Sequence, residues 1–206
     1  MKKPTKFIFA CQQCGQQFSK WVGRCSECGE WNSVVEERLG SAEGVSSALS
    51  SSSSAGKPEP ISQILASEYP RYVSDLPELD NVLGGGLVPG SVVLLGGEPG
   101  VGKSTLLLQA ADQFGRSGKT VLYVSGEESS SQVALRANRL GVKTDQLLFV
   151  SETALEPILG HIKELKPQIL ILDSVQTVHS REMDSQPGSV GQLRECSNAI
   201  IATCKE

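Results

Sequence analysis

Residues 91–108 read SVVLLGGEPGVGKSTLLL, and the rest of the chain can be interpreted outward from this stretch. Gly97, Gly102, Lys103 and Ser104 satisfy the phosphate-loop pattern G-x-x-x-x-G-K-[ST] without a gap. The apolar run 92–95 predicts a buried strand before the loop, and residues 105–114 have helical spacing after it. A strand, a glycine-rich turn and a helix in this order predict a site for a nucleoside triphosphate.

The chemistry expected of this loop depends on its residue types. Glycines let backbone N–H groups converge on phosphate oxygens, and the helix N-terminus adds the positive end of its dipole. We expect Lys103 to bind the β- and γ-phosphates of ATP and the Ser104 hydroxyl to ligate Mg²⁺. The residues predicted to bind the nucleotide and its metal are Gly97, Glu98, Pro99, Gly100, Val101, Gly102, Lys103, Ser104, Thr105 and, farther along the chain, Asp173. The alternative is a glycine-rich turn before an ordinary helix.

Downstream of the loop, apolar runs alternate with segments of helical spacing. Strands are predicted over Thr120–Val124, Leu147–Val150 and Ile169–Leu172, and helices over Ser130–Leu140, Leu155–Leu165 and from Val190 onward. Such alternation predicts an α/β fold, a mostly parallel sheet with helices on both faces. Ligands of such sheets bind beyond the carboxyl ends of the strands, so residues at those ends are candidates for the site.

Acidic residues occupy two of these strand ends. Asp173 comes directly after the apolar run ILIL and is expected to hold Mg²⁺ directly or through water. Glu127 and Glu128 come after VLYVSG, where a carboxylate can orient and deprotonate the attacking water. Of the two, Glu127 is preferred as the base because it lies closer to the strand end. The candidate catalytic residues are therefore Lys103, Glu127 and Glu128; the alternative is an acidic pair that caps the next helix.

Near the N-terminus, two C-x₂-C pairs predict a tetrahedral four-thiolate zinc site. The ligands are Cys11, Cys14, Cys25 and Cys28. Gly15 and Gly29 stand directly after the second cysteine of each pair, where the turn can require a left-handed residue. A segment of about 30 residues cannot fold by burial alone, so the metal would supply its folding energy. Two disulfides, or iron in a rubredoxin-like site, are the alternatives.

Basic and aromatic residues are interleaved within this cysteine module. Lys20, Trp21 and Arg24 precede the second pair, and Trp31 comes after it. Such residues can stack on and neutralise single-stranded nucleic acid. The alternative is that the tryptophans pack around the metal, which we expect for Trp31, while both interpretations stay open for Trp21.

Composition and linker residues predict the domain organisation. The 206 residues carry a net charge of −4, with 39% hydrophobic and 20% charged residues, typical of soluble globular proteins. No apolar run approaches the roughly 20 residues of a membrane span, and the N-terminus does not read as a signal peptide, so a cytoplasmic protein is expected. The serine-rich stretch 36–60 predicts a flexible linker. We therefore expect a zinc-binding module over 1–35, this linker, and a nucleotide-binding domain over 61–206.

Taken together, these motifs resemble the RadA (Sms) family of bacterial DNA-repair proteins. The resemblance is carried by FACQQCG, KWVGRCSECGEWNS, LGGGLVPGS, GEPGVGKST, SGEES, LDSVQT and SQPGSVGQLRE, in this order. It implies a RecA-like ATPase that forms homo-hexameric rings on single-stranded or branched DNA, drives branch migration and works with a recombinase partner. By position, Gly97–Ser104 matches the Walker A loop, Glu127 the base and Asp173 the Walker B acid.

The resemblance also assigns a DNA-binding loop. Ser180–Gly191 matches the first DNA-binding loop of the family, with Arg181 and Arg194 as candidate phosphate contacts. The alternative is that Arg181 pairs with Glu182 or Asp184 on a solvated loop.

The sequence departs from the family pattern after this loop. Family members continue with a Lys-Asn-Arg-Phe-Gly motif and a Lon-protease-like domain, and neither is present in these 206 residues. They also have a strand that inserts between the phosphate-loop strand and the Asp173 strand. The resemblance therefore leaves stability, ring assembly and full turnover of this chain open. Two other functions compete with a DNA motor: a RecA-like nucleotide switch acting on protein partners, and a zinc-knuckle interaction module.

Overall fold

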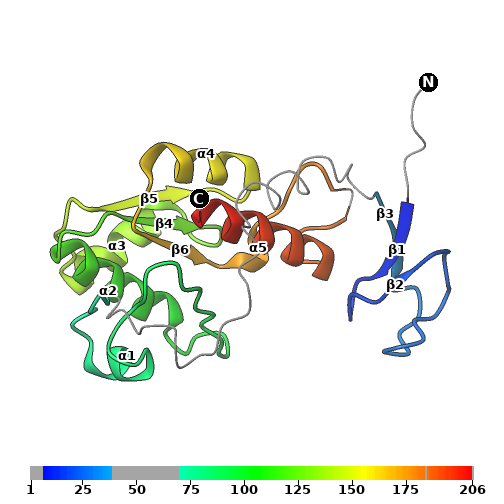
Figure 1. Cartoon of the computed structure of the whole chain (residues 1–206), viewed down its shortest axis with the longest axis horizontal. Coiled ribbons are helices and arrows are strands. Elements are labelled where there is room, and N and C mark those ends of the chain that lie inside the picture. Colours follow the sequence, from blue (N-terminus) through cyan, green and yellow to red (C-terminus); the bar gives the residue numbers. More distant parts are fainter. Residues whose placement is uncertain (1–6, 39–69, 184, 206) are drawn as a thin grey trace, which may run out of the picture.

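The structure is a computed structural model that describes residues 7–38, 70–183 and 185–205. The stretch predicted as a serine-rich linker lies almost entirely outside these residues. Figure 1 shows the described elements as two groups, a small set of N-terminal strands and a larger α/β group.

The N-terminal group is a three-stranded antiparallel sheet. Its strands are β1 (Phe7–Cys11), β2 (Gln17–Phe18) and β3 (Val34–Arg38), in the order β2-β1-β3. Its hydrophobic core cluster is small: Cys11, Cys25 and Val34 are buried, with Phe9, Phe18 and Val22 packed against them. So small a cluster cannot offset the chain entropy of the module, as expected of a fold that depends on a metal.

The second group contains the remaining elements. They are α1 (Pro77–Val82), α2 (Lys103–Arg116), β4 (Val121–Ser125), α3 (Ser130–Leu140), β5 (Leu147–Ser151), α4 (Leu155–Leu165), β6 (Ile169–Asp173), the 3₁₀ turn η2 (Val175–Thr177) and α5 (Val190–Cys204). Every element predicted downstream of the phosphate loop is present, with helix bounds for α3 and α4 as predicted. Each of the three strands ends one residue beyond its predicted range, so β6 includes Asp173, and β4 begins one residue later than predicted, at Val121.

The three strands pair in parallel in the order β5-β4-β6, with β4 in the centre. One face packs with α2 and α3 through Leu108, Phe114, Val121, Tyr123 and Ile171. The other face packs with α4 and α5 through Leu122, Val124, Ile158, Cys196 and Ile200. In Figure 1, α4 lies above the strands and α1 and α2 lie below them. The predicted parallel sheet with helices on both faces is confirmed.

The predicted buried strand Val92–Leu95 is wrong in this structure. Residues 91–98 form no strand, and the side chains of Val92 and Leu94 are 62% and 86% exposed. The physical reason is the lack of a pairing partner among the described residues. β6 is hydrogen-bonded to β4, and no described strand flanks it on the other side. Apolar β-branched residues favour a strand only where a neighbour satisfies their backbone groups.

None of the helices in the described part of the chain is both long and apolar enough to span a membrane.

Candidate nucleotide and metal sites

The phosphate loop leads directly into α2. Gly100 and Gly102 have φ values of +80° and +102°, and Gly102 is the N-terminal cap of the helix. A Cβ atom at either position would meet no atom within 4 Å. The left-handed backbone, and not lack of space, is therefore what requires glycine here. The predicted turn is thus present, and α2 begins at Lys103, two residues before the predicted start at Thr105.

Lys103 contacts the loop that precedes it. Its Nζ donates to the carbonyl oxygens of Gly97 at 2.8 Å and Glu98 at 2.9 Å. The ammonium group is thereby placed over the turn 97–102, where we expect the phosphates to bind. Ser104 lies in the first turn of α2, half-buried, and Thr105 is the next residue.

Asp173 lies at the end of β6, on the face of the sheet that α2 covers. Its register partner on β4 is Ser125, and it lies on the same face of β6 as Ile169 and Ile171, which belong to the apolar cluster under α2. Residues two apart on a strand share a face, so Asp173 is directed to the same side as the helix that begins at the phosphate loop. The sheet thereby places the Walker B candidate and the phosphate loop on one side of the molecule.

The two glutamates after β4 have different partners. Glu127 is exposed, and its Oε1 accepts a hydrogen bond from the Ser174 hydroxyl at 2.6 Å. Ser174 is the residue after Asp173, so this bond joins the ends of β4 and β6. Glu128 instead forms an ion pair with Arg136 of α3. The cap of α3 is Ser129, which forms a capping box with Gln132.

Two residues at this edge were not identified from the sequence. Tyr123 of β4 donates its hydroxyl to Asp173 Oδ2 at 2.7 Å, and burial together with this bond raises the pKa of Tyr123 well above its usual value. Gly126 lies so close to Thr177 of η2 that a Cβ atom would collide with the threonine side chain. The available signals were a tyrosine in an aliphatic strand and a glycine between the strand and its acids.

The segment between η2 and α5 is fixed at its base by a buried glutamine. Gln192 of α5 is 1% exposed. Its amide accepts from the backbone N–H of Ser180 at 2.9 Å and donates to the carbonyls of Ser180 at 3.2 Å and Ser185 at 3.0 Å. Such a fully paired buried amide holds both ends of the segment in one position. No local pattern in the sequence pointed to this role of Gln192.

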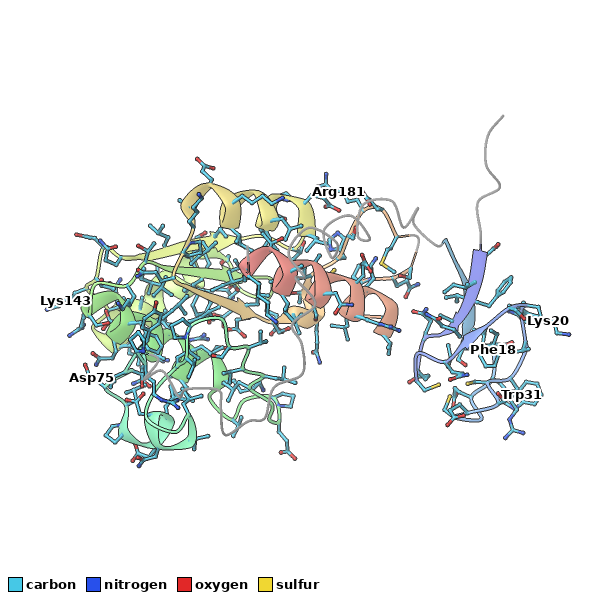
Figure 2. The ribbon with its side chains drawn as sticks, viewed as in Figure 1. Phe18, Lys20, Trp31, Asp75, Lys143 and Arg181 are labelled. Atoms are coloured by element: carbon cyan, nitrogen blue, oxygen red, sulfur yellow. The ribbon has the colours of Figure 1, made fainter. Side chains whose placement is uncertain are left out.

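The two candidate DNA-contacting arginines are exposed. Arg181 donates its backbone N–H to Glu156 Oε1, and its side chain extends to the surface in Figure 2. Within the described residues it forms no ion pair with Glu182, and Asp184 lies outside them. Backbone N–H groups of Ala154 and Thr153 lower the pKa of Glu152, and the charge of Arg181 adds to this effect. Arg194 is exposed on α5.

The four predicted cysteine ligands converge on one point. Their Sγ atoms all lie within 4.8 Å of one another, with Cys11–Cys28 and Cys14–Cys25 at 3.6 Å. A tetrahedron of sulfurs about 2.3 Å from zinc has edges of about 3.8 Å, whereas a disulfide would require about 2.05 Å. The geometry fits the predicted zinc site and disfavours the two disulfides.

The turns and charges of this cluster also fit a metal. Gly15 and Gly29 have φ values of +75° and +77°, the left-handed conformation that was predicted, and their N–H groups donate to the carbonyls of Cys11 and Cys25. Although burial opposes ionisation, hydrogen bonds from Ser33 and the backbone lower the pKa of Cys11 to about 6. The backbone N–H of Glu30 acts to lower the pKa of Cys28, but burial and the neighbouring sulfurs raise it to about 12. Four crowded thiols cannot all ionise without a cation.

Both tryptophans of the module are exposed, which contradicts the expected core packing of Trp31. The exposed fractions are 58% for Trp21 and 67% for Trp31. Trp31 lies under the Arg24 guanidinium at 5.7 Å, and Trp21 donates its indole N–H to the Val34 carbonyl. Figure 2 shows Lys20 and Trp31 at the surface of the module. The core has too few residues to cover an indole ring, so phenylalanine and valine fill it instead.

Comparison with known proteins assigns both parts of the chain. The family model described as AAA domain matches residues 58–205, and one described as rubredoxin metal binding domain matches residues 9–36. The DNA repair protein RadA of Bacillus subtilis is 47% identical over 203 residues, 98% of this chain and 44% of the relative. RadA of Escherichia coli is 44% identical over 210 residues, 100% of this chain and 45% of the relative.

The fold has a counterpart among solved structures. The flagellar accessory protein FlaH from Methanocaldococcus jannaschii superposes with a TM-score of 0.50 at 21% identity, over 65% of this chain and 66% of FlaH. The chain spans a little under half the length of the curated RadA proteins that it matches. The resemblance to RadA proteins is confirmed, and the RecA-like fold with a four-cysteine zinc module is shown. On the match over residues 58–205, the chain belongs to the AAA domain family.

Proposed function

We propose that the chain is the ATP-hydrolysing part of a DNA-repair motor. The observation that carries this proposal is the common placement of the phosphate loop and the Asp173 carboxylate. The loop begins α2, and α2 covers the face of the sheet on which Asp173 and Tyr123 lie. Binding of a triphosphate between these elements is the standard use of such an edge in open α/β sheets.

The residues present fit ATP with magnesium. Loop N–H groups and Lys103 would bind the phosphates, and the Ser104 hydroxyl and Asp173 would hold the metal. Hydroxyl and carboxylate oxygens are the ligands that Mg²⁺ prefers. When bound, the metal neutralises charge on the phosphate oxygens. The Lys103 ammonium contacts the carbonyls of Gly97 and Glu98, and it would exchange these contacts for phosphate oxygens when a nucleotide binds.

Glu127 is the better candidate for the group that activates water. It is exposed beside Ser174, one residue from Asp173, and it has no cationic partner among the described residues. A general base must be free to accept a proton. Glu128 forms an ion pair with Arg136, and this ion pair would have to break before Glu128 could accept a proton from water. We therefore assign proton abstraction to Glu127 and an anchoring role to Glu128.

The proposal that DNA is the partner rests on the loop after β6 and on the similarity to RadA. Most of residues 181–183 and 185–188 are exposed, while Gln192 and Glu156 hold Ser180 and Arg181 at the base of this segment. Arg181 and Arg194 would contact DNA phosphates. In a ring of six copies, the weak contacts of all subunits with one DNA molecule would together give a higher affinity. The activity that the resemblance implies is branch migration in the cytoplasm, together with a recombinase partner.

The cysteine module is proposed to carry one zinc ion. We also propose the three-part division of the chain into residues 1–35, 36–60 and 61–206. Trp31, which lies beside Arg24, and the exposed Trp21 are a second candidate surface for single-stranded DNA.

The deciding experiment is ATP hydrolysis by the full-length protein with and without single-stranded DNA. If the protein is a DNA motor, DNA should stimulate its ATP hydrolysis, because DNA binding and nucleotide state are coupled through the segment after β6. A nucleotide switch that acts on protein partners hydrolyses ATP at the same rate in both conditions. Absence of Mg²⁺-dependent hydrolysis in both conditions contradicts the assignment of the site itself.

A further inference from the structure

Tyr123 places a hydroxyl group inside an otherwise apolar strand. The side chain is 2% exposed, and its neighbours along β4 are Leu122 and Val124. A buried hydroxyl costs free energy unless it is hydrogen-bonded. Phenylalanine would fill the same space without that cost, so packing alone does not account for tyrosine at this position.

The partner of this hydroxyl is the Walker B candidate. Tyr123 lies opposite Ile171 in the parallel register, and Asp173 is two residues farther along β6 on the same face. The ring reaches diagonally along the strand direction, and its hydroxyl donates to Asp173 Oδ2 at 2.7 Å. The ring itself is held by burial and by Phe149 of β5, whose centroid lies 6.1 Å away. The donor is therefore fixed in space by the core.

A fixed donor on one oxygen restricts the carboxylate to one rotamer. Oδ2 accepts from Tyr123, so Oδ1 is the oxygen that this donor leaves free for a metal ion or for its bound water. Groups that orient a metal ligand in this way raise affinity because the ligand need not lose rotational freedom when the ion binds. The Tyr123 hydroxyl reaches the active edge only through Asp173, so it is not itself a catalytic residue.

We propose that Tyr123 is a positioning residue for the magnesium site, holding the Asp173 carboxylate so that Oδ1 is directed at the ion. This inference rests on the proposed role of Asp173 in holding Mg²⁺. It adds a residue from the centre of β4 to a site otherwise composed of strand ends and the phosphate loop.

The test is Tyr123→Phe in the full-length protein, with two readouts of the metal site. The first is the Mg²⁺ concentration that gives half-maximal ATP hydrolysis at saturating nucleotide. The second is Mn²⁺ affinity in the presence of ADP, measured by electron paramagnetic resonance. We expect both to weaken about tenfold, the usual size of such an orienting contact. Nucleotide affinity in EDTA and the melting temperature should stay close to the parent, because the ring still fills its space.

Tyr72→Phe is the matched control, since its ring packs under the Lys119 ammonium at 4.5 Å, away from Asp173. It should change neither readout by more than about twofold, because it touches no group that orients the metal ligands. Shifts below about threefold in both readouts for Tyr123→Phe overturn the inference, even if the melting temperature falls.

Asp173→Asn separates this inference from the proposed function. If Asp173→Asn leaves the metal dependence unchanged, the assignment of Asp173 fails and the role of Tyr123 fails with it. If Asp173→Asn shifts the metal dependence and Tyr123→Phe does not, the role of Tyr123 alone is rejected. Combined in one chain, the two substitutions should give no more than the effect of Asp173→Asn. Additive effects would mean that Tyr123 acts elsewhere.

Discussion

The zinc module and the nucleotide site are assembled in opposite ways. In the module, all four ligands come from residues 11–28, and two of them, Cys11 and Cys25, are also core residues. In the candidate nucleotide site, the predicted functional groups are spread from Gly97 to Asp173, and a separate core of strands and helices supports them. Two of the cysteine ligands are thus part of the core of their own module. The cores under the second site, by contrast, contain none of its predicted functional residues.

This difference separates stability from function. Removing a ligand from the module should destroy its fold, because little apolar area is left to hold it. Removing a functional side chain from the nucleotide site should abolish activity and leave melting nearly unchanged. Each side of this contrast can be tested by substitution, beginning with the largest expected effect.

Cys11→Ser should unfold the module. The metal supplies about 10–16 kcal/mol in four-ligand zinc modules, far more than the few buried side chains here can replace. Elemental analysis should fall from about one zinc per chain to near zero, and amide signals of residues 7–33 should collapse. Melting of the nucleotide domain should not change. Cys204→Ser, which alters an exposed cysteine of α5, is the control and should keep its zinc. Full occupancy in a Cys11→Ser, Cys25→Ser double variant would exclude the site.

Lys103→Ala should show the opposite behaviour. Loss of a charge-assisted contact to the β- and γ-phosphates should reduce turnover by about 10³-fold or more. The melting temperature should stay close to that of the parent, because the ammonium contacts only exposed loop carbonyls. Lys143→Ala, a lysine beyond the end of α3, serves as the control for charge. A large loss of stability in Lys103→Ala would contradict the contrast between the two sites.

Glu127→Gln and Glu128→Gln form a matched pair at one strand end. Glu127→Gln should reduce hydrolysis by about 10²–10⁴-fold while ATP binding is retained, as expected for loss of a general base. Glu128→Gln leaves Arg136 without its ionic partner and should reduce stability more than turnover. Single-turnover hydrolysis and thermal melting measure the two effects. The reverse result would make Glu128 the base and reject our assignment.

Arg181→Ala and Arg194→Ala should have the smallest effects. Each removes one candidate phosphate contact, so single-stranded DNA affinity should fall several-fold, with the slope of log affinity against log salt reduced by about one. Hydrolysis without DNA should be unchanged. Arg139→Ala, an exposed arginine of α3, is the control. Unchanged affinity and slope in the Arg181→Ala, Arg194→Ala double variant would shift the DNA surface to Trp21 and Arg24.

Local patterns were sufficient wherever a residue's role depends on near neighbours in the sequence. The C-x₂-C pairs predicted the ligands, and the positive φ values of Gly15 and Gly29 were expected from their place in each turn. Helices α3 and α4 begin and end where periodicity placed them, because capping residues and proline act within one turn. The phosphate-loop pattern likewise predicted the turn and a helix after it, which begins two residues earlier than its periodicity indicated.

Local patterns failed where a residue's environment depends on distant elements. Val92–Leu95 has the composition of a buried strand, but no described strand lies beside it and it is exposed. Trp31 was expected in a core that proved too small for an indole ring. In both cases the side chains are apolar, as the sequence indicated. The sequence did not indicate which elements of the folded chain lie beside them.

By itself, the sequence determined the fold class. It also predicted the cysteine ligands, the phosphate loop and the acids at the strand ends, because each is encoded by spacing within a short segment. The tertiary structure decided which acid faces which partner. The order β5-β4-β6 brings Tyr123 to Asp173 and Ser174 to Glu127, and α3 supplies Arg136 to Glu128. These contacts join residues up to 50 positions apart. Strand order and helix packing, which no local pattern contains, are what bring them within hydrogen-bonding distance.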